Sequence, residues 1–163
     1  MSDRVALFPG TFDPVTRGHV DVVRRGAALF DRLVVAVAVG GKTTWFPVEE
    51  RVALVRAAVG DLRNVEVVPF DGLLVEFARR HGARALLRGV RTYQDWEYEL
   101  RMLQMNRHLA PELETVFLAP AVEWAYVSST LVREVSALGG DLTDLVPPAV
   151  AAALARRRAP GTR

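Results

Sequence analysis

The stretch Val5-Ala6-Leu7-Phe8-Pro9-Gly10-Thr11-Phe12-Asp13-Pro14-Val15-Thr16-Arg17-Gly18-His19 sets the interpretation of the whole chain. Its first four residues are apolar, as in a buried strand, and Pro9-Gly10 is predicted to stop that strand. A turn-rich loop leads to His19, which opens a helix. The free N–H groups and positive dipole end at that helix start favour an anion such as a nucleotide phosphate. The alternative is an ordinary strand-to-helix connection holding an incidental histidine.

Strand-like apolar runs alternate with segments of helical spacing along the chain. The predicted strands are Val5 to Phe8, Leu33 to Val39, Val65 to Val68, Ala85 to Leu87 and Thr115 to Leu118. The predicted helices are Val20 to Phe30, Val48 to Val59, Leu73 to His81, Tyr93 to Leu109, Ser129 to Leu138 and Pro148 to Arg158. The second strand is apolar on both faces, as in a covered parallel strand. We therefore predict an α/β fold with a five-stranded parallel sheet, helices on both faces and extra helices at the C-terminal end.

Composition excludes several classes of protein. The chain has 163 residues, half of them hydrophobic, which fits one domain over residues 1–158 and a flexible tail over 159–163. It has no cysteine, signal-peptide segment or membrane-length apolar run, so we expect a cytoplasmic protein without disulfides or a membrane partner. Of 21 basic side chains against 19 acidic ones, four are arginines at the C-terminus. The body is therefore slightly acidic, which argues against nucleic acid as a partner.

Polar and charged residues follow the carboxyl ends of four predicted strands: Thr11 and His19, Lys42, Arg88 and Arg91, and Ser128-Ser129-Thr130. The carboxyl ends of parallel strands share one edge of an open sheet, so these residues are expected to converge on one site. Two arginines, a lysine, a histidine and several hydroxyls suit a ligand with several negative charges, such as a polyphosphate.

Each of these residues also has a simpler explanation. Lys42 could be an exposed loop lysine, and the serines could only cap a helix. Arg88 ends a buried strand, so either a protein carboxylate or an anionic ligand must compensate its charge. Glu99 is expected on a solvated helix face. Met102, Met105 and Leu109 form a stripe at helical spacing, which indicates either core packing or an adaptable groove for a flexible apolar ligand.

Absent motifs narrow the chemistry further. The sequence has no Gly-x-Gly-x-x-Gly after the first strand, no Gly-x-x-x-x-Gly-Lys-Ser/Thr loop, no Gly-x-Ser-x-Gly elbow and no histidine-rich metal spacing. These absences argue against a dinucleotide dehydrogenase, a P-loop NTPase, a serine hydrolase and a histidine metal centre. Among the functions considered, the remaining one is chemistry on a phosphate group in which the protein supplies no nucleophile.

Motifs in order along most of the chain resemble those of the bacterial phosphopantetheine adenylyltransferases, nucleotidyltransferases with a His-x-Gly-His type signature. They are Pro9 to Pro14 with Gly18-His19, Glu49-Glu50-Arg51, Leu87 to Arg91, Glu97-Tyr98-Glu99, Asn106-Arg107 and Trp124 to Thr130. Thr16 stands at the first signature position, as in the phosphopantetheine branch. The resemblance implies a Rossmann-like fold and transfer of AMP from ATP to 4'-phosphopantetheine, with Mg²⁺ held through the ATP phosphates and no metal ligands from the protein.

The resemblance also implies roles for individual residues. The implied catalytic residues are His19, as transition-state stabiliser, with Lys42, Thr11 and Arg91. The implied ATP-binding residues are Thr11, Phe12, His19, Gly89, Val90, Arg91, Glu99, Trp124, Ala125, Tyr126, Val127, Ser128, Ser129 and Thr130. The implied phosphopantetheine-binding residues are Thr11, Lys42, Leu74 and Arg88, and the helical surface adds Met105 and Asn106. A homohexamer inhibited by coenzyme A is implied as well.

Two other functions compete with this one. One is a related nucleotidyltransferase that uses nicotinamide mononucleotide or glycerol phosphate as acceptor, and the other is a nucleotide-binding regulatory module without catalysis. The chain also departs from the family at two places. Gly40-Gly41-Lys42-Thr43 replaces a proline-containing turn with paired lysines, and Pro47 replaces a capping threonine.

Overall fold

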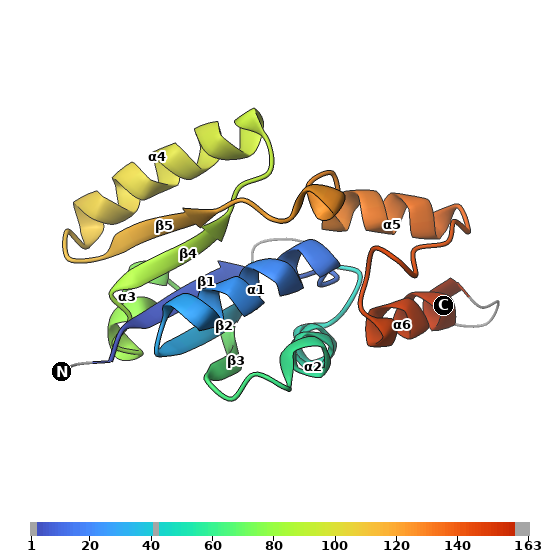
Figure 1. Ribbon diagram of the computed structural model, residues 1–163, viewed down its shortest axis with the longest axis horizontal. Helices are drawn as coiled ribbons and strands as arrows, with labels where there is room; N and C mark the ends of the chain where they lie inside the picture. The colour runs from blue at the N-terminus through green and yellow to red at the C-terminus, as the bar shows by residue number, and fades with distance from the viewer. Residues whose placement is uncertain (1–2, 41–42, 159–163) are drawn as a thin grey trace.

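The computed structural model describes residues 3–40 and 43–158 and consists of a parallel sheet flanked by helices (Figure 1). The strands are β1 (Val5–Gly10), β2 (Arg32–Ala38), β3 (Val65–Phe70), β4 (Ala85–Gly89) and β5 (Glu114–Leu118). The helices are α1 (Arg17–Leu29), α2 (Val48–Val59), α3 (Leu74–Arg80), α4 (Tyr93–Leu109), α5 (Ser129–Ala137), α6 (Pro148–Arg158) and the short 3₁₀ helix η1 (Val122–Trp124). The predicted alternation is confirmed, and the predicted tail lies outside the described residues.

The sheet has the strand order β3-β2-β1-β4-β5, and every neighbouring pair is parallel. The chain winds outward from β1 to β3 and then crosses to β4 on the opposite side of β1. The winding direction therefore reverses between β1 and β4. In open α/β sheets this is the point where a crevice forms beyond the carboxyl ends of the strands and binds ligands. The Rossmann-like class predicted for the chain is confirmed.

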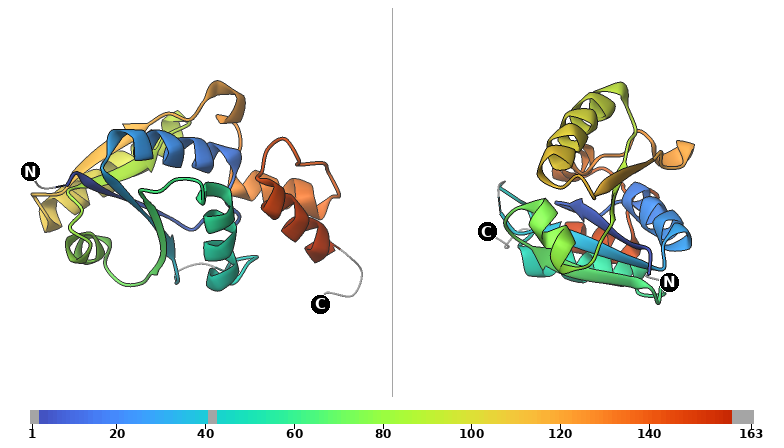
Figure 2. Two further views of the ribbon diagram at one scale, coloured as in Figure 1. Left: turned by 60° about the horizontal axis from the view of Figure 1, so that its bottom comes forward. Right: turned by 90° about the vertical axis from the view of Figure 1, so that its left-hand side faces the viewer.

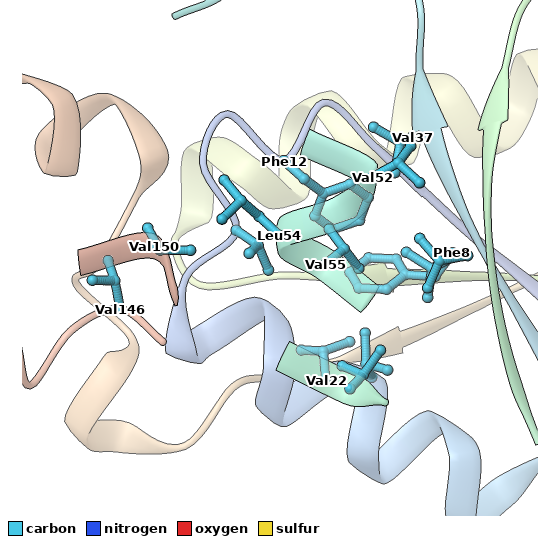
Figure 3. Close-up of a cluster of buried hydrophobic side chains, with 14 of the residues drawn as sticks. Phe8, Phe12, Val22, Val37, Val52, Leu54, Val55, Val146 and Val150 are labelled. Atoms are coloured by element: carbon cyan, nitrogen blue, oxygen red, sulfur yellow. The ribbon is translucent and has the colours of Figure 1, made fainter. Parts of the chain in front are cut away.

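Helices cover both faces of the sheet, as the all-apolar second strand indicates (Figure 2). Alternate residues of β2 point to opposite faces. Leu33, Val35 and Val37 join the cluster that contains α1, α2 and α6, whereas Val34 and Ala36 join the cluster that contains α3. Figure 3 shows the first cluster, in which Phe8 and Phe12 meet the valines of α2. Helices α5 and α6 lie beyond the carboxyl edge of the sheet, where they extend this core (Figure 1).

The prediction that Pro9-Gly10 stops the first strand is wrong. Both residues stay in register with β2, Pro9 opposite Ala36 and Gly10 opposite Val37. The pairing of β1 with β4, however, ends at Leu7. Pro9 is tolerated because β1 is paired on only one side there, and proline lacks the N–H that a fully paired position needs. The gap on the other side opens the crevice at the winding reversal.

The first helix begins at Arg17, three residues before the predicted start at Val20. Thr16 is its N-cap and His19 lies in its first turn, so the histidine is part of the helix rather than the residue before it. At the other end of the chain, the Arg157 guanidinium of α6 lies over the Trp45 ring, 5.3 Å from the centroid. The predicted helix from Pro148 to Arg158 is confirmed, so Arg156, Arg157 and Arg158 are helical. Among the described helices, none combines the length and apolarity that crossing a membrane requires.

Candidate active site

Two hollows open at the carboxyl edge of the sheet where β1 and β4 separate. The His19 pocket has a volume of about 330 Å³ and lies between the β1–α1 loop, β4 and the start of α5. The Leu74 pocket has a volume of about 300 Å³ and lies between the same loop, α3 and α4. The two pockets share part of their walls, because both are bordered by Pro9, Gly10, Thr11, Arg88 and Glu99. A ligand in each pocket would therefore meet the other beside Thr11 and Arg88.

The His19 ring is held by the cap of its own helix. The Thr16 N–H donates to His19 Nδ1 at 3.0 Å, and the His19 N–H donates to Thr16 Oγ1 at 3.3 Å. This is a capping box in which histidine takes the place usually held by glutamate or glutamine. Because Nδ1 accepts a hydrogen bond, the proton of the neutral ring resides on Nε2. The ring lines the pocket and can offer Nε2–H as a donor.

The surroundings of His19 keep it neutral. Burial, followed by repulsion from Arg91 and Arg88, lowers the pKa of His19 to about 4. At neutral pH the ring is therefore an uncharged donor, and the positive charge of the pocket comes from the two arginines. The Phe12 ring packs edge-on against the imidazole with centroids 5.1 Å apart, which limits its rotation.

Arg88 at the end of β4 is compensated by a protein carboxylate. Its Nε and Nη2 donate to the two oxygens of Glu99 at 2.8 and 2.6 Å, and Nη1 donates to the Pro9 carbonyl at 2.6 Å. Glu99 is 6% exposed, so the expectation of a solvated glutamate is wrong. Helix α4 turns this residue inward toward β4. A bidentate pair fixes the guanidinium plane, and the side chain still borders both pockets.

Arg91 connects two segments that lie far apart in the sequence. Its Nε donates to Asp95 Oδ2 at 3.1 Å, and its Nη1 donates to the Val127 carbonyl at 2.9 Å. Asp95 lies three residues after Thr92, the N-cap of α4, and it lines the His19 pocket. Sequence reasoning missed Asp95. Its position four residues after Arg91 and three after a capping threonine was the available signal.

The start of α5 forms another wall of the His19 pocket. Ser128 is the N-cap of this helix, and its Oγ accepts a hydrogen bond from the Leu131 N–H at 3.0 Å. The Ser129 hydroxyl donates to the Pro14 carbonyl at 2.8 Å, which ties α5 to the β1–α1 loop. The capping role that the sequence indicates is confirmed for Ser128, whereas Ser129 is the first residue of the helix. Since α1 also begins at this pocket, two helix N-termini bring partial positive charge to it.

The Leu74 pocket is a groove lined by both apolar and polar side chains. Leu74, Phe70 and Met102 line it, and Asn106, 8% exposed, adds an amide from α4. Met105, predicted as a substrate contact, does not line this pocket and is 55% exposed. Met102 therefore stands where Met105 was predicted. The methionine stripe is not core, because all its members are partly exposed, and one of them forms groove wall.

The predicted ATP residues separate into two groups. Ten of them line the His19 pocket: Thr11, Phe12, His19, Gly89, Arg91, Glu99, Val127, Ser128, Ser129 and Thr130. Four do not: Val90, Trp124, Ala125 and Tyr126. Trp124 instead borders a third hollow, with Arg17, Val20 and the start of α6. Lys42 lies outside the described residues. Within the described part of the chain, no three histidine or carboxylate side chains gather into a metal-binding group.

Comparison with known proteins identifies the family of this chain. Residues 7–135 match the cytidylyltransferase-like family. The phosphopantetheine adenylyltransferase of Thioalkalivibrio sulfidiphilus is 56% identical over 154 residues, covering 94% of this chain and 97% of that protein. The enzyme of the same name from Aromatoleum aromaticum is 52% identical, covering 92% of this chain and 93% of that protein.

A solved structure shares the fold at much lower sequence similarity. It is a Vibrio parahaemolyticus protein assigned as a nicotinate-nucleotide adenylyltransferase, with a TM-score of 0.71 and 16% identity, covering 94% of this chain and 99% of that one. The likeness shows a common fold, whereas the sequence identities above define the family. This chain is a member of the phosphopantetheine adenylyltransferases, within the cytidylyltransferase-like family.

Proposed function

We propose that this chain transfers the adenylyl group of ATP to 4'-phosphopantetheine, giving dephospho-coenzyme A and pyrophosphate. The observation that carries the proposal is the meeting of two different pockets at Thr11 and Arg88. One pocket has positive charge and helix N-termini, which suit a triphosphate. The other combines apolar side chains with the Asn106 amide and the Arg88–Glu99 pair, which suits a long flexible arm that ends in a phosphate. Membership of the family supports the same reaction.

In this proposal ATP occupies the His19 pocket. The N-termini of α1 and α5 bring partial positive charge to this pocket, which suits phosphate oxygens. Arg91, held by Asp95 and the Val127 carbonyl, is already oriented before any ligand enters. We assign it to the departing pyrophosphate, with Ser129 and Thr130. Val90, Trp124, Ala125 and Tyr126 do not line this pocket, so they would bind ATP only if part of the nucleotide extends beyond the pocket.

The acceptor occupies the Leu74 pocket with its phosphate beside Thr11 and Arg88. The apolar walls cover the pantetheine arm, and the Asn106 amide can hydrogen-bond to one of its amide groups. Lys42, whose role is inferred from the sequence alone, would bind the attacking phosphate. Met102 replaces Met105 in this assignment, because it lines the groove.

The reaction needs no base and no covalent enzyme intermediate. A phosphate oxygen of the acceptor, already ionised at neutral pH, bonds to the α-phosphorus of ATP in line with the bond to the β-phosphate oxygen. That bond breaks, and pyrophosphate leaves with its electron pair. The neutral His19 donates Nε2–H to an α-phosphate oxygen as negative charge builds there. Catalysis then consists of positioning and charge stabilisation.

The donor set is compatible with Mg²⁺ held mainly through the ATP phosphates. No group of three metal-ligating side chains is present in residues 3–40 and 43–158, and the carboxylates at the pocket, Asp95 and Glu99, are bound to arginines. Bound in this way, Mg²⁺ would neutralise phosphate charge during transfer. The residues of this chain would orient the phosphates around it.

The proposal extends to assembly and control. We propose a cytoplasmic homohexamer that coenzyme A inhibits, supported by the family resemblance. Val122 and Leu138 are 88% and 89% exposed, which would suit surfaces covered by neighbouring copies. Light scattering gives the mass in solution, and a hexamer is the expected result. Added coenzyme A is expected to reduce the rate at fixed ATP, because it shares the pantetheine arm of the acceptor.

Pyrophosphate release from ATP and Mg²⁺ tests the reaction directly. We expect release with 4'-phosphopantetheine and little with nicotinamide mononucleotide, glycerol phosphate or no acceptor, and mass spectrometry should identify dephospho-coenzyme A. Preference for another acceptor would assign a related transferase reaction. ATP binding without release with any acceptor would support a regulatory module instead.

A further inference from the structure

Arg51 in the first turn of α2 is buried, with 1% exposure, and lines neither pocket. Its guanidinium donates to three backbone carbonyls: Nε to Phe46 at 3.0 Å, and Nη1 to Thr11 at 2.6 Å and Ala38 at 2.9 Å. Burial lowers the pKa of the Arg51 guanidinium, and electrostatic attraction to Asp13 and Glu49 acts in the opposite direction. A buried charge is costly unless hydrogen bonds compensate it. The three hydrogen bonds of Arg51 provide this compensation, and an apolar side chain at this position could not form them.

The three carbonyls belong to three separate segments around the site. Thr11 lies in the β1–α1 loop, Ala38 ends β2, and Phe46 precedes α2. The planar, rigid donor fork of arginine can reach acceptors in several directions at once. Lysine carries its donors on one nitrogen and cannot span them in the same way. Arg51 therefore fixes the distance between the Thr11 loop and both ends of the 39–45 connection.

Asp13 also connects two of these segments, the β1–α1 loop and the residues before α2. Its carboxylate accepts the N–H groups of Trp45 at 2.8 Å and Phe46 at 3.0 Å. Phe46 is thus held through its N–H by Asp13 and through its carbonyl by Arg51. The Asp13 carbonyl accepts from Arg133 of α5, so this anchor continues into the helix whose start lines the His19 pocket. Figure 3 shows Phe12, between Thr11 and Asp13, with Val52 and Val55 of α2 in the same buried cluster.

We propose that Arg51 is a positioning residue for the acceptor: it sets the place of Thr11, where the two pockets meet, without touching either substrate. The inference rests on the proposed function. Of the residues whose carbonyls Arg51 binds, Thr11 borders both pockets and Ala38 lines the Leu74 pocket but not the His19 pocket. Loss of the anchor should therefore affect phosphopantetheine more than ATP.

The test compares Arg51→Lys and Arg51→Gln with Val59→Ala. Val59 is buried at the far end of α2 and lines neither pocket, so its truncation lowers stability without loosening the Thr11 loop. Steady-state KM and kcat are measured for each substrate on protein whose circular dichroism matches wild type. We expect kcat/KM for 4'-phosphopantetheine to fall about 10- to 100-fold in the Arg51 variants, the scale for a misplaced group. KM for ATP should change less than about threefold, and Val59→Ala should keep wild-type kinetics.

Unchanged kcat/KM for phosphopantetheine in both Arg51 variants would overturn the inference, as would an equal loss in Val59→Ala or equal effects on the two substrates. If neither Arg51 variant folds, Asp13→Asn weakens the hold on Trp45 and Phe46, and Arg133→Ala controls for the contact of Asp13 with α5. Asp13→Asn should then give the larger effect on phosphopantetheine, and Arg133→Ala should not. Wild-type protein without phosphopantetheine-dependent pyrophosphate release would refute the proposed function itself, so the two failures are distinguishable.

Discussion

The backbone N–H of Thr16 donates to Nδ1 of His19 at 3.0 Å, which makes the signature histidine a helix cap as well as a pocket residue. One nitrogen of the ring is used by the backbone and the other is left for the ligand. The hydrogen bond thus selects the tautomer in which Nε2 carries the proton. The same contact ties the orientation of the ring to the start of α1, where Thr16, Gly18 and His19 line the same pocket.

His19→Ala should lower kcat about 10²- to 10³-fold, the scale for removing one transition-state donor. It should also cost about 1 kcal/mol of stability, because the capping box loses its second half. Pyrophosphate release and urea unfolding measure the two effects. His108→Ala, an exposed histidine in the last turn of α4, serves as control and should be near wild type in both. A His19→Ala enzyme with normal kcat would remove His19 from catalysis.

The free energy of unfolding should depend on pH through His19. Its native pKa of about 4 lies below the unfolded value of 6.5, so between these values the unfolded chain binds more protons. The contribution of His19 is therefore complete above pH 6.5 and is lost as the pH falls toward 4, by up to about 3 kcal/mol. His19→Gln keeps a capping side chain but does not titrate. Urea unfolding at several pH values should show that wild type loses more stability than this variant, and parallel curves would contradict the low pKa.

Glu99→Ala should destabilise the protein strongly, because it leaves the Arg88 guanidinium without its bidentate partner. Removing one member of a largely buried pair typically costs about 3 kcal/mol. Since Arg88 borders both pockets, KM should rise for both substrates. Glu97→Ala, two residues away on the exposed side of α4, is the matched control. Equal melting temperatures for the two variants would show that the Arg88 pair does not contribute to stability.

Met102 and Met105 provide a direct test of which face of α4 meets the acceptor. Met102 lines the Leu74 pocket and Met105 does not. Met102→Ala should raise KM for 4'-phosphopantetheine several-fold, since about 1–2 kcal/mol of apolar contact is lost. Met105→Ala should leave it unchanged. Steady-state kinetics with saturating ATP measures both, and the reverse order of effects would return Met105 to the site.

The order of elements and the edge that carries the site were predictable from the sequence. Apolar runs such as Leu33 to Val39 identify buried parallel strands without reference to the rest of the chain. Once the sheet is parallel, residues after separate strands must share its carboxyl edge. His19, Arg88 and Ser129 could therefore be grouped before their distances were known, and all of them line the His19 pocket.

Element ends and partners were harder to predict. The strand through Pro9-Gly10 persists because β4 leaves β1 unpaired on that side, which local propensity cannot reveal. Burial of Glu99 depends on which face of α4 turns toward β4, and the choice between Met102 and Met105 has the same origin. Helical spacing shows which residues share a face of a helix, but it does not show which of those faces turns toward the sheet.

The sequence by itself determined the parallel α/β architecture, the family and the cluster of phosphate-binding residue types, because these depend on local hydrophobic pattern and on chain order. Only the tertiary structure decided which charges are paired, which ring nitrogen of His19 is free, and that Arg51 joins three distant carbonyls. The Arg88 pair and the contacts of Arg51 depend on distances between separate segments of the chain, whereas the free nitrogen of His19 depends on the backbone geometry of the cap at Thr16, three residues away. These features arise when burial removes water and each polar group must find a partner within the protein.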